Sequence, residues 1–152
     1  MKRLAALLWA AGLASGCAGR MQAARLGVER VEIRRVLASG AHLEVWFQVE
    51  NEGPQELLLE GLECELELDG HKVGACLPRG EMNVAGHGHM TTSAQVEVAF
   101  LVDQRTGLTA ILERKEVLAV MSGHYMLREA GVRRRVSFQA RGRVPLEREE
   151  SE

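Results

Sequence analysis

Two runs of alternating apolar and polar residues occupy the middle of the chain, at 43–50 and 62–69. In each run the apolar side chains fall on one face, and mostly charged or polar ones on the other. The apolar residues are Leu43, Val45, Phe47 and Val49 in the first run, and Leu62, Cys64, Leu66 and Leu68 in the second. This period predicts two strands, each with one buried and one hydrated face. The segment 51–54, Asn-Glu-Gly-Pro, separates them. Proline has no backbone N–H to donate to a neighbouring strand, and glycine tolerates the positive φ of a turn, so the segment is predicted to interrupt the strand.

Further strands are predicted on both sides of this pair. A first strand spans 26–36, with a phase shift near Glu29 that predicts a bulge. Asp69-Gly70 predicts a two-residue hairpin turn into a short strand at 72–77. Alternation over 90–100 predicts the longest strand. Later strands begin near Tyr125 and Val132, and the last is expected to end before Pro145.

One short helix is predicted over 104–115, where the spacing of Leu108, Ile111 and Leu112 changes to a helical period. Asp103 or Thr106 is expected to supply the N-cap oxygen. Short strands with frequent turns and one helix predict an all-β fold, an antiparallel β-sandwich of the immunoglobulin or fibronectin III type. The alternative is a barrel with an interior ligand site.

The N-terminus is a different kind of segment. Lys2 and Arg3 precede the apolar stretch 4–13, which is too short to span a membrane and predicts a signal peptide over 1–16. The small residues before Cys17 resemble the bacterial lipobox, in which the cysteine is acylated (palmitate is one such group) and becomes the mature N-terminus. Cys17 is therefore the expected lipid attachment site. Residues 17–25 are the tether, 26–146 the folded domain and 147–152 a charged, frayed tail.

Charge restricts the partners of the mature chain. Without Lys2 and Arg3 the 19 basic residues become 17, against 21 acidic ones, which gives a formal charge of −4. This balance argues against nucleic-acid binding and against a basic surface on anionic lipid, so the expected membrane contact is the lipid alone. Ala18 after the cysteine favours the periplasmic face of the outer membrane in a host with two membranes.

Cys64 and Cys76 are the two remaining cysteines. An oxidising periplasm would permit a bridge between them. A two-residue turn at Asp69-Gly70 places Cys64 opposite Ala75, whereas a three-residue turn places it opposite Cys76. A disulfide and two free thiols therefore both remain open.

Candidate sites for chemistry are sparse. His87 and His89 lie in a glycine-rich turn without a third ligand, so no metal or cofactor is expected. Ser122 and His124 share a strand face, but no glycine elbow surrounds the serine. The residues Glu63, Glu65 and Glu67 form an acidic row, and Arg133, Arg134 and Arg135 form a basic cluster that we expect to pair with that row. Neither set predicts a catalytic centre or a small-molecule substrate.

Trp46 is the remaining candidate. It falls on the polar face of its strand, so it is either covered by the helix or exposed as a binding surface.

The order of elements resembles the late embryogenesis abundant (LEA) type 2 family, whose module is also called the water stress and hypersensitive response (WHy) domain. The resemblance covers about residues 26–146: a lead strand, a strand ending at Asn51, the run 57–59, the 62–68 strand with its hairpin, and the helix before the Tyr125 strand. Family members carry Asn-Pro at the kink, whereas here the proline follows at Pro54. The resemblance implies a non-catalytic sandwich associated with desiccation and stress.

Two function classes follow. The first is a lipid-anchored binding or protective module of the cell envelope, associated with the stress response. The second is a structural partner in an envelope assembly that docks through an edge strand or the Trp46 face. An enzyme is not expected.

Overall fold

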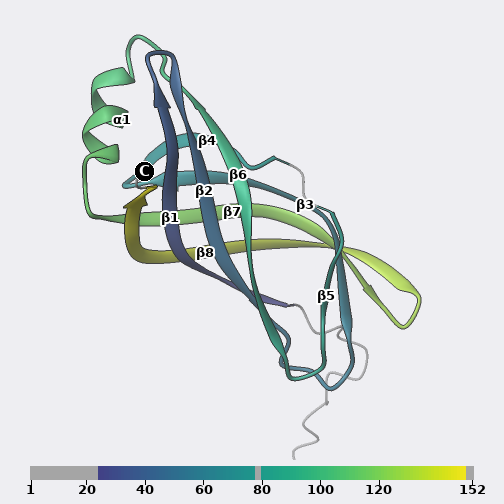
Figure 1. Ribbon diagram of the computed structural model, residues 1–152. Coiled ribbons are helices and arrows are strands. Elements are labelled where there is room, and N and C mark those ends of the chain that lie inside the picture. The colour runs from purple at the N-terminus through teal and green to yellow at the C-terminus, as the bar shows by residue number, and fades with distance from the viewer. Residues whose placement is uncertain (1–23, 78–79, 150–152) are drawn as a thin grey trace, which may run out of the picture.

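The computed structural model describes residues 24–77 and 80–149, which form eight strands and one helix (Figure 1). The strands are β1 (Arg25–Leu37), β2 (Gly40–Glu50), β3 (Leu57–Leu68), β4 (His71–Ala75), β5 (Met82–Val84), β6 (His89–Ala99), β7 (Glu116–Glu129) and β8 (Val132–Arg148). The helix α1 (Arg105–Leu112) connects β6 to β7. The predicted all-β class with one connecting helix is confirmed.

The strands pair into one strongly curled sheet in the order β4–β3–β7–β8–β1–β2–β6, with β5 also on β3 (Figure 1). All pairs are antiparallel except one, since Val31–Ile33 of β1 run parallel to Leu146–Arg148 of β8. The expectation of an entirely antiparallel sheet is therefore wrong. One mixed, half-barrel-like sheet also takes the place of the two separate layers of an immunoglobulin sandwich. This first-to-last pairing is remote in sequence and leaves no local pattern.

The inner face of the sheet holds one apolar core. Leu43, Val45, Phe47 and Val49 of β2 are all at most 1% exposed, and their polar neighbours face outward, as the alternation predicts. The apolar set of β3 is buried in the same way. Tyr125 lies fully buried in this core, and its hydroxyl donates to the Ala24 carbonyl at 3.3 Å. Burial raises the pKa of Tyr125, although the positive charge of Arg134 acts in the opposite direction.

Asn51 organises the kink between β2 and β3. Its side chain is 1% exposed, and its amide nitrogen donates to the carbonyls of Gln55 at 2.7 Å, Val84 at 3.2 Å and Ala85 at 3.1 Å. Its side-chain oxygen accepts the Gly53 N–H at 3.0 Å. The turn therefore does not need a proline directly after the asparagine, because one buried amide ties the kink to β5 and the segment that follows it.

The expected ends of α1 and β8 differ from the structure. The N-cap of α1 is Gln104, without a side-chain cap bond, so neither Asp103 nor Thr106 caps the helix. Leu108, Ile111 and Leu112 are nevertheless its buried face, as predicted. The last strand continues through Pro145 to Arg148 and includes two residues assigned to the charged tail. β1 shows the predicted register shift between Val28 and Arg30.

Candidate functional site

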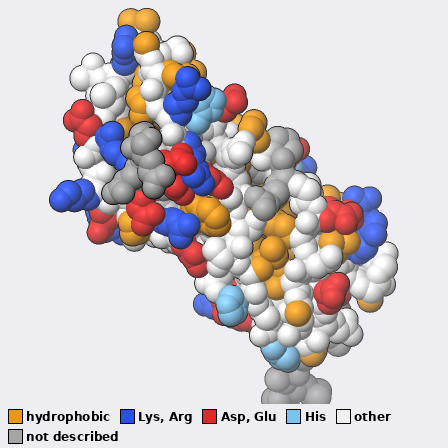
Figure 2. Space-filling view, viewed as in Figure 1, with side chains coloured by type: hydrophobic (Ala, Val, Ile, Leu, Met, Phe, Trp, Pro, Cys, Tyr) orange, Lys and Arg blue, Asp and Glu red, His pale blue; other side chains and the backbone are white. Residues whose placement is uncertain are grey.

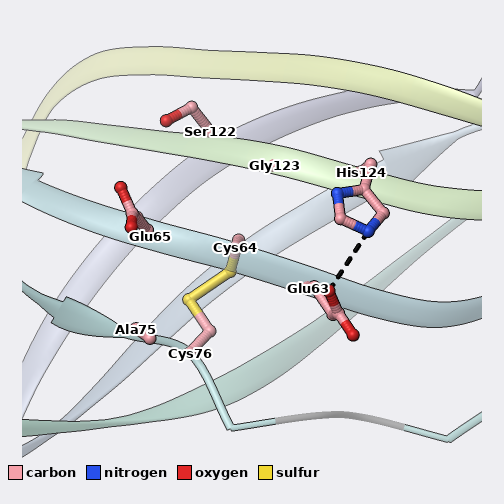
Figure 3. A pocket seen from close by; sticks show the side chains of 8 residues that line it. All are labelled: Glu63, Cys64, Glu65, Ala75, Cys76, Ser122, Gly123 and His124. Atoms are coloured by element: carbon pink, nitrogen blue, oxygen red, sulfur yellow. Dashed lines mark ion pairs between the residues drawn. A yellow bond between two sulfur atoms is a disulfide. The ribbon is translucent and has the colours of Figure 1, made fainter.

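A pocket of about 500 Å³ lies over β3, the end of β4 and β7 (Figure 3). It is lined by Glu63, Cys64, Glu65, Ala75, Cys76, Ser122, Gly123 and His124. Glu63 and Glu65 on β3 and Ser122 and His124 on β7 contribute its polar side chains.

A disulfide joins Cys64 to Cys76 in this pocket, with their Cα atoms 5.2 Å apart. The hairpin turn has two residues, Asp69 and Gly70, both with positive φ, and it pairs Leu68 with His71. A register shift then makes Val73 an extra residue in β4, so that the Cys76 N–H reaches the Cys64 carbonyl at 2.7 Å. This β-bulge brings the two cysteines together. The two turns considered from the sequence, of two and of three residues, did not include a bulge.

Gly123 allows β7 to approach β3 at the pocket. A Cβ at this position would lie 1.9 Å from the Glu63 carbonyl oxygen and 2.7 Å from the Cys64 Cα, much closer than atoms can pack. Only glycine fits this contact. The sequence motif Ser-Gly-His around it is therefore explained by strand packing.

His124 lies at the centre of a polar chain across three strands. Its Nε2 is 3.1 Å from Glu63 on β3, and its Nδ1 is 3.1 Å from the guanidinium of Arg135 on β8. Because arginine has only donors, Nδ1 must accept, and the ring proton of the neutral imidazole is then on Nε2, facing the carboxylate. Both ring nitrogens are thus engaged. Ser122 lies apart from this chain (Figure 3), so the arrangement is not that of an activated serine.

The basic cluster pairs with acids only in part as expected. Arg133 contacts Glu60 at 2.9 Å, and Arg128 contacts the same carboxylate at 3.6 Å, so Glu60 takes the place of the predicted row. Glu65 in that row pairs with Lys72 at 3.8 Å. These contacts cross neighbouring strands and depend on register, which explains why the sequence pattern did not show the partners.

Trp46 lies on the polar face of its strand, as predicted, and it is partly buried. Arg30 from β1 lies over the ring at 4.4 Å from the centroid, and the indole N–H donates to Glu32 at 3.1 Å. A ligand for this ring would have to displace Arg30. Arg34 next to it contacts three carboxylates, those of Glu32, Glu44 and Glu149. The hydrogen bond to Glu44 raises the pKa of Arg34 despite partial desolvation.

His87 and His89 are exposed at the turn that leads into β6, and His87 has a positive φ. Within residues 24–77 and 80–149, no group of three or more His, Cys, Asp or Glu side chains is arranged to hold a metal ion. No helix of this part of the chain is long and apolar enough to cross a membrane. Cys17, the expected lipid attachment site, lies outside the described residues.

No family model matches the chain, and no curated protein matches it either. Several solved structures do. A protein from Arabidopsis thaliana with a known solution structure is 11% identical, matches over 88% of this chain and 90% of its own, and gives a TM-score of 0.52. A second solution structure, provisionally described as a late embryogenesis abundant protein, is 13% identical over 88% and 76% of the chains, with a TM-score of 0.47. An Archaeoglobus fulgidus protein is 12% identical over 80% and 94%, with a TM-score of 0.45. At these identities the similarity is one of fold alone.

Proposed function

We propose that this chain is an exported, lipid-anchored domain of the cell envelope that acts by binding or shielding, without turnover. The observation that carries the proposal is the disulfide between Cys64 and Cys76. Disulfides form and persist in oxidising compartments, which supports a destination outside the cytoplasm. The signal-like segment 1–16 and the lipobox-like residues before Cys17 supply the route and the anchor, with the outer membrane as the expected location.

The outward face of the domain favours shielding over chemistry. The pocket over β3 and β7 contains one histidine, whose two ring nitrogens contact Glu63 and Arg135. Arginine–glutamate contacts cover much of the rest of the face, for example those of Arg34 and of Arg133. Such a surface is strongly hydrated and carries a negative net charge, so it would resist close contact between envelope components as water is withdrawn.

The association with desiccation stress comes from the resemblance to the LEA type 2 and WHy proteins. The fold similarity to the Arabidopsis structure supports the architecture on which that resemblance depends. The stress role itself is our proposal.

Fractionation of cells tests the anchor. The wild-type chain should stay with the membranes through an alkaline carbonate wash, which removes peripheral contacts, and Cys17→Ser should be released by that wash into the soluble fraction. A wild-type chain that is already soluble, or a variant that remains equally bound, would exclude lipid attachment at Cys17. Intact-mass measurement of the released domain, with and without reductant, tests for the disulfide in the same samples.

Survival after drying tests the role. A deletion strain is dried and rewetted beside strains that carry the wild-type chain or Cys17→Ser. We expect the wild type to restore survival and the unanchored variant to restore less of it. Equal survival of all three strains would exclude the stress role, and a stoichiometric partner in a pull-down would then establish the assembly function instead.

A further inference from the structure

One end of the molecule carries a cluster of exposed aliphatic side chains, which we name the apolar apex. It consists of Val36 and Leu37 at the end of β1 and Leu101 and Val102 in the segment before α1, which are 50%, 36%, 55% and 98% exposed. A hydrogen bond from the Phe100 N–H to the Ser39 carbonyl, at 2.9 Å, holds the two loops together. The loops lie side by side at the top of Figure 1, and apolar side chains form the uppermost surface in Figure 2.

The clustering distinguishes this apex from the rest of the surface. The other large apolar side chains with high exposure in the described ranges are Leu77 and Val132, at 42% and 57%, and they lie on separate elements. Single exposed aliphatic residues are ordinary, whereas several on two adjoining loops indicate an interaction surface.

Two arginines without ion-pair partners flank the apolar apex. Arg35 precedes Val36, and Arg105 begins α1, and neither makes an ion pair within residues 24–77 and 80–149. Most other arginines of the outer face pair with glutamates. Two acids lie in the same part of the fold: Asp103, which is exposed in the same loop, and Glu97, which lies 4.0 Å from His42. By formal charge these two acids balance the two arginines, so the apex is neutral whereas the whole chain is negative.

We propose that the apolar apex inserts into the boundary between headgroups and acyl chains of a phospholipid bilayer. Leu101 and Val102 would enter first, and Arg35 and Arg105 would lie at the phosphates. The convex shape favours a bilayer as the occupant: Val102 is almost completely exposed and has no wall of this chain beside it, and a fluid surface can close around such a projection. The folded domain would thus touch lipid directly, a contact additional to any anchor at Cys17.

A fluorescent label tests this contact in the full-length chain. Cys17→Ser removes the one cysteine outside the disulfide, and Val102→Cys introduces a single thiol for an environment-sensitive dye. Val132→Cys, at the start of β8, is the matched control at another exposed valine. Vesicles of phosphatidylethanolamine and phosphatidylglycerol are the probe. The label at 102 should shift to the blue and be quenched by acyl-brominated lipid, whereas the label at 132 should stay in water.

Two further variants make the test specific. Leu101→Asp, added to the chain labelled at 102, should weaken the lipid-dependent signal by roughly tenfold, because a carboxylate replaces an inserted aliphatic group. Arg35→Gln with Arg105→Gln should weaken it by roughly tenfold on the anionic vesicles.

The proposal is overturned if the chain co-sediments with vesicles while the label at 102 stays in water, or if both labels respond alike. It is also overturned if the shift at 102 appears without lipid as protein concentration rises, since a second copy of the chain would then cover the apex. Failure of the chain to bind these vesicles at all would overturn it as well.

Discussion

At the scale of single residues, Gly123 lies at one of the positions where two strands approach too closely for a side chain. Its neighbours are backbone atoms of β3, which cannot move away as a flexible side chain would. We predict that Gly123→Ala lowers the free energy of unfolding by about 3 kcal/mol, at the upper end of the cost of overpacking. Gly27→Ala is the control, because nothing lies within 4 Å of a Cβ there. Urea unfolding of both variants measures the difference, and equal stabilities would contradict the predicted clash.

Asp69 shows how one turn residue can join two parts of the chain. Its carboxylate accepts the Leu118 N–H at 2.8 Å and contacts Arg114, while its own N–H donates to the Leu118 carbonyl at 2.9 Å. Burial alone would raise the pKa of Asp69, but the Leu118 hydrogen bond and the guanidinium of Arg114 outweigh it, so the pKa is lowered. The carboxylate is therefore more stable in the folded chain than in the unfolded one.

The sign of the pH effect follows from this lowered pKa. The contribution of Asp69 is fully present above the ordinary aspartate range, near pH 4, and is lost as pH falls through the lower pKa of the folded state. Asp69→Asn, which tolerates the same positive φ, should cost about 1–3 kcal/mol at neutral pH and reduce the loss of stability on acidification. Asp103→Asn, in an exposed loop, is the control. Parallel acid slopes for wild type and Asp69→Asn would show that the ionic contacts contribute nothing.

At the scale of elements, Asn51 holds β2, β3 and β5 in their relative positions. Asn51→Ala would leave three carbonyls and the Gly53 N–H without the amide partner, in a site that is 1% exposed. We expect a loss of about 3 kcal/mol in chemical denaturation, since each orphaned buried group costs about 1–3 kcal/mol. The exposed Asn83 on β5 provides the matched control, with an expected change within about 0.5 kcal/mol for Asn83→Ala. Similar losses for the two variants would contradict this role.

Alternation predicted the elements well where one face of a strand is buried along its whole length. The buried sets of β2 and β3, and the helical face at Leu108, have the expected phase. The pattern does not reveal how strands pair. The parallel contact of β1 with β8 depends on residues more than a hundred positions apart, and it keeps Pro145 within a strand that local reasoning ended early.

The candidate site was predicted less completely for the same reason. Cys64, Cys76, Ser122 and His124 were each noticed, but their meeting depends on an extra residue at Val73 and on the register of β3 with β7. Glu63, His124 and Arg135 come from three different strands. The Ser-Gly-His spacing was a usable signal, although it indicates the close approach at Gly123 and not a nucleophile.

At the scale of the whole molecule, the curled sheet is held together at two places. The first is the parallel pairing of β1 with β8, where the Glu149 N–H reaches the Ile33 carbonyl at 3.1 Å. The second lies between the edge strands β4 and β6. Here Cys76, just after β4, forms an isolated β-bridge with Val96, and the Leu77 N–H donates to the Gln95 carbonyl at 2.8 Å. The disulfide fixes Cys76 to β3 directly beside this second contact. The disulfide therefore supports the closure that has the shorter strand pairing.

Removal of the disulfide should therefore loosen the contact between the β4 and β6 ends of the sheet and leave the pairing of β1 with β8 intact. Cys64→Ser combined with Cys76→Ser should lower the free energy of unfolding by about 3 kcal/mol, the size expected for a loop of this length. Hydrogen exchange should become faster at the amide of Leu77, while the amide of Glu149 should exchange at its wild-type rate under native conditions. Reductant should reproduce the change in the wild type and leave the double variant unaffected. Equal acceleration at both amides would mean that the disulfide stabilises the domain as a whole, and unchanged exchange at Leu77 would show that the hydrogen bonds close this end of the sheet without it.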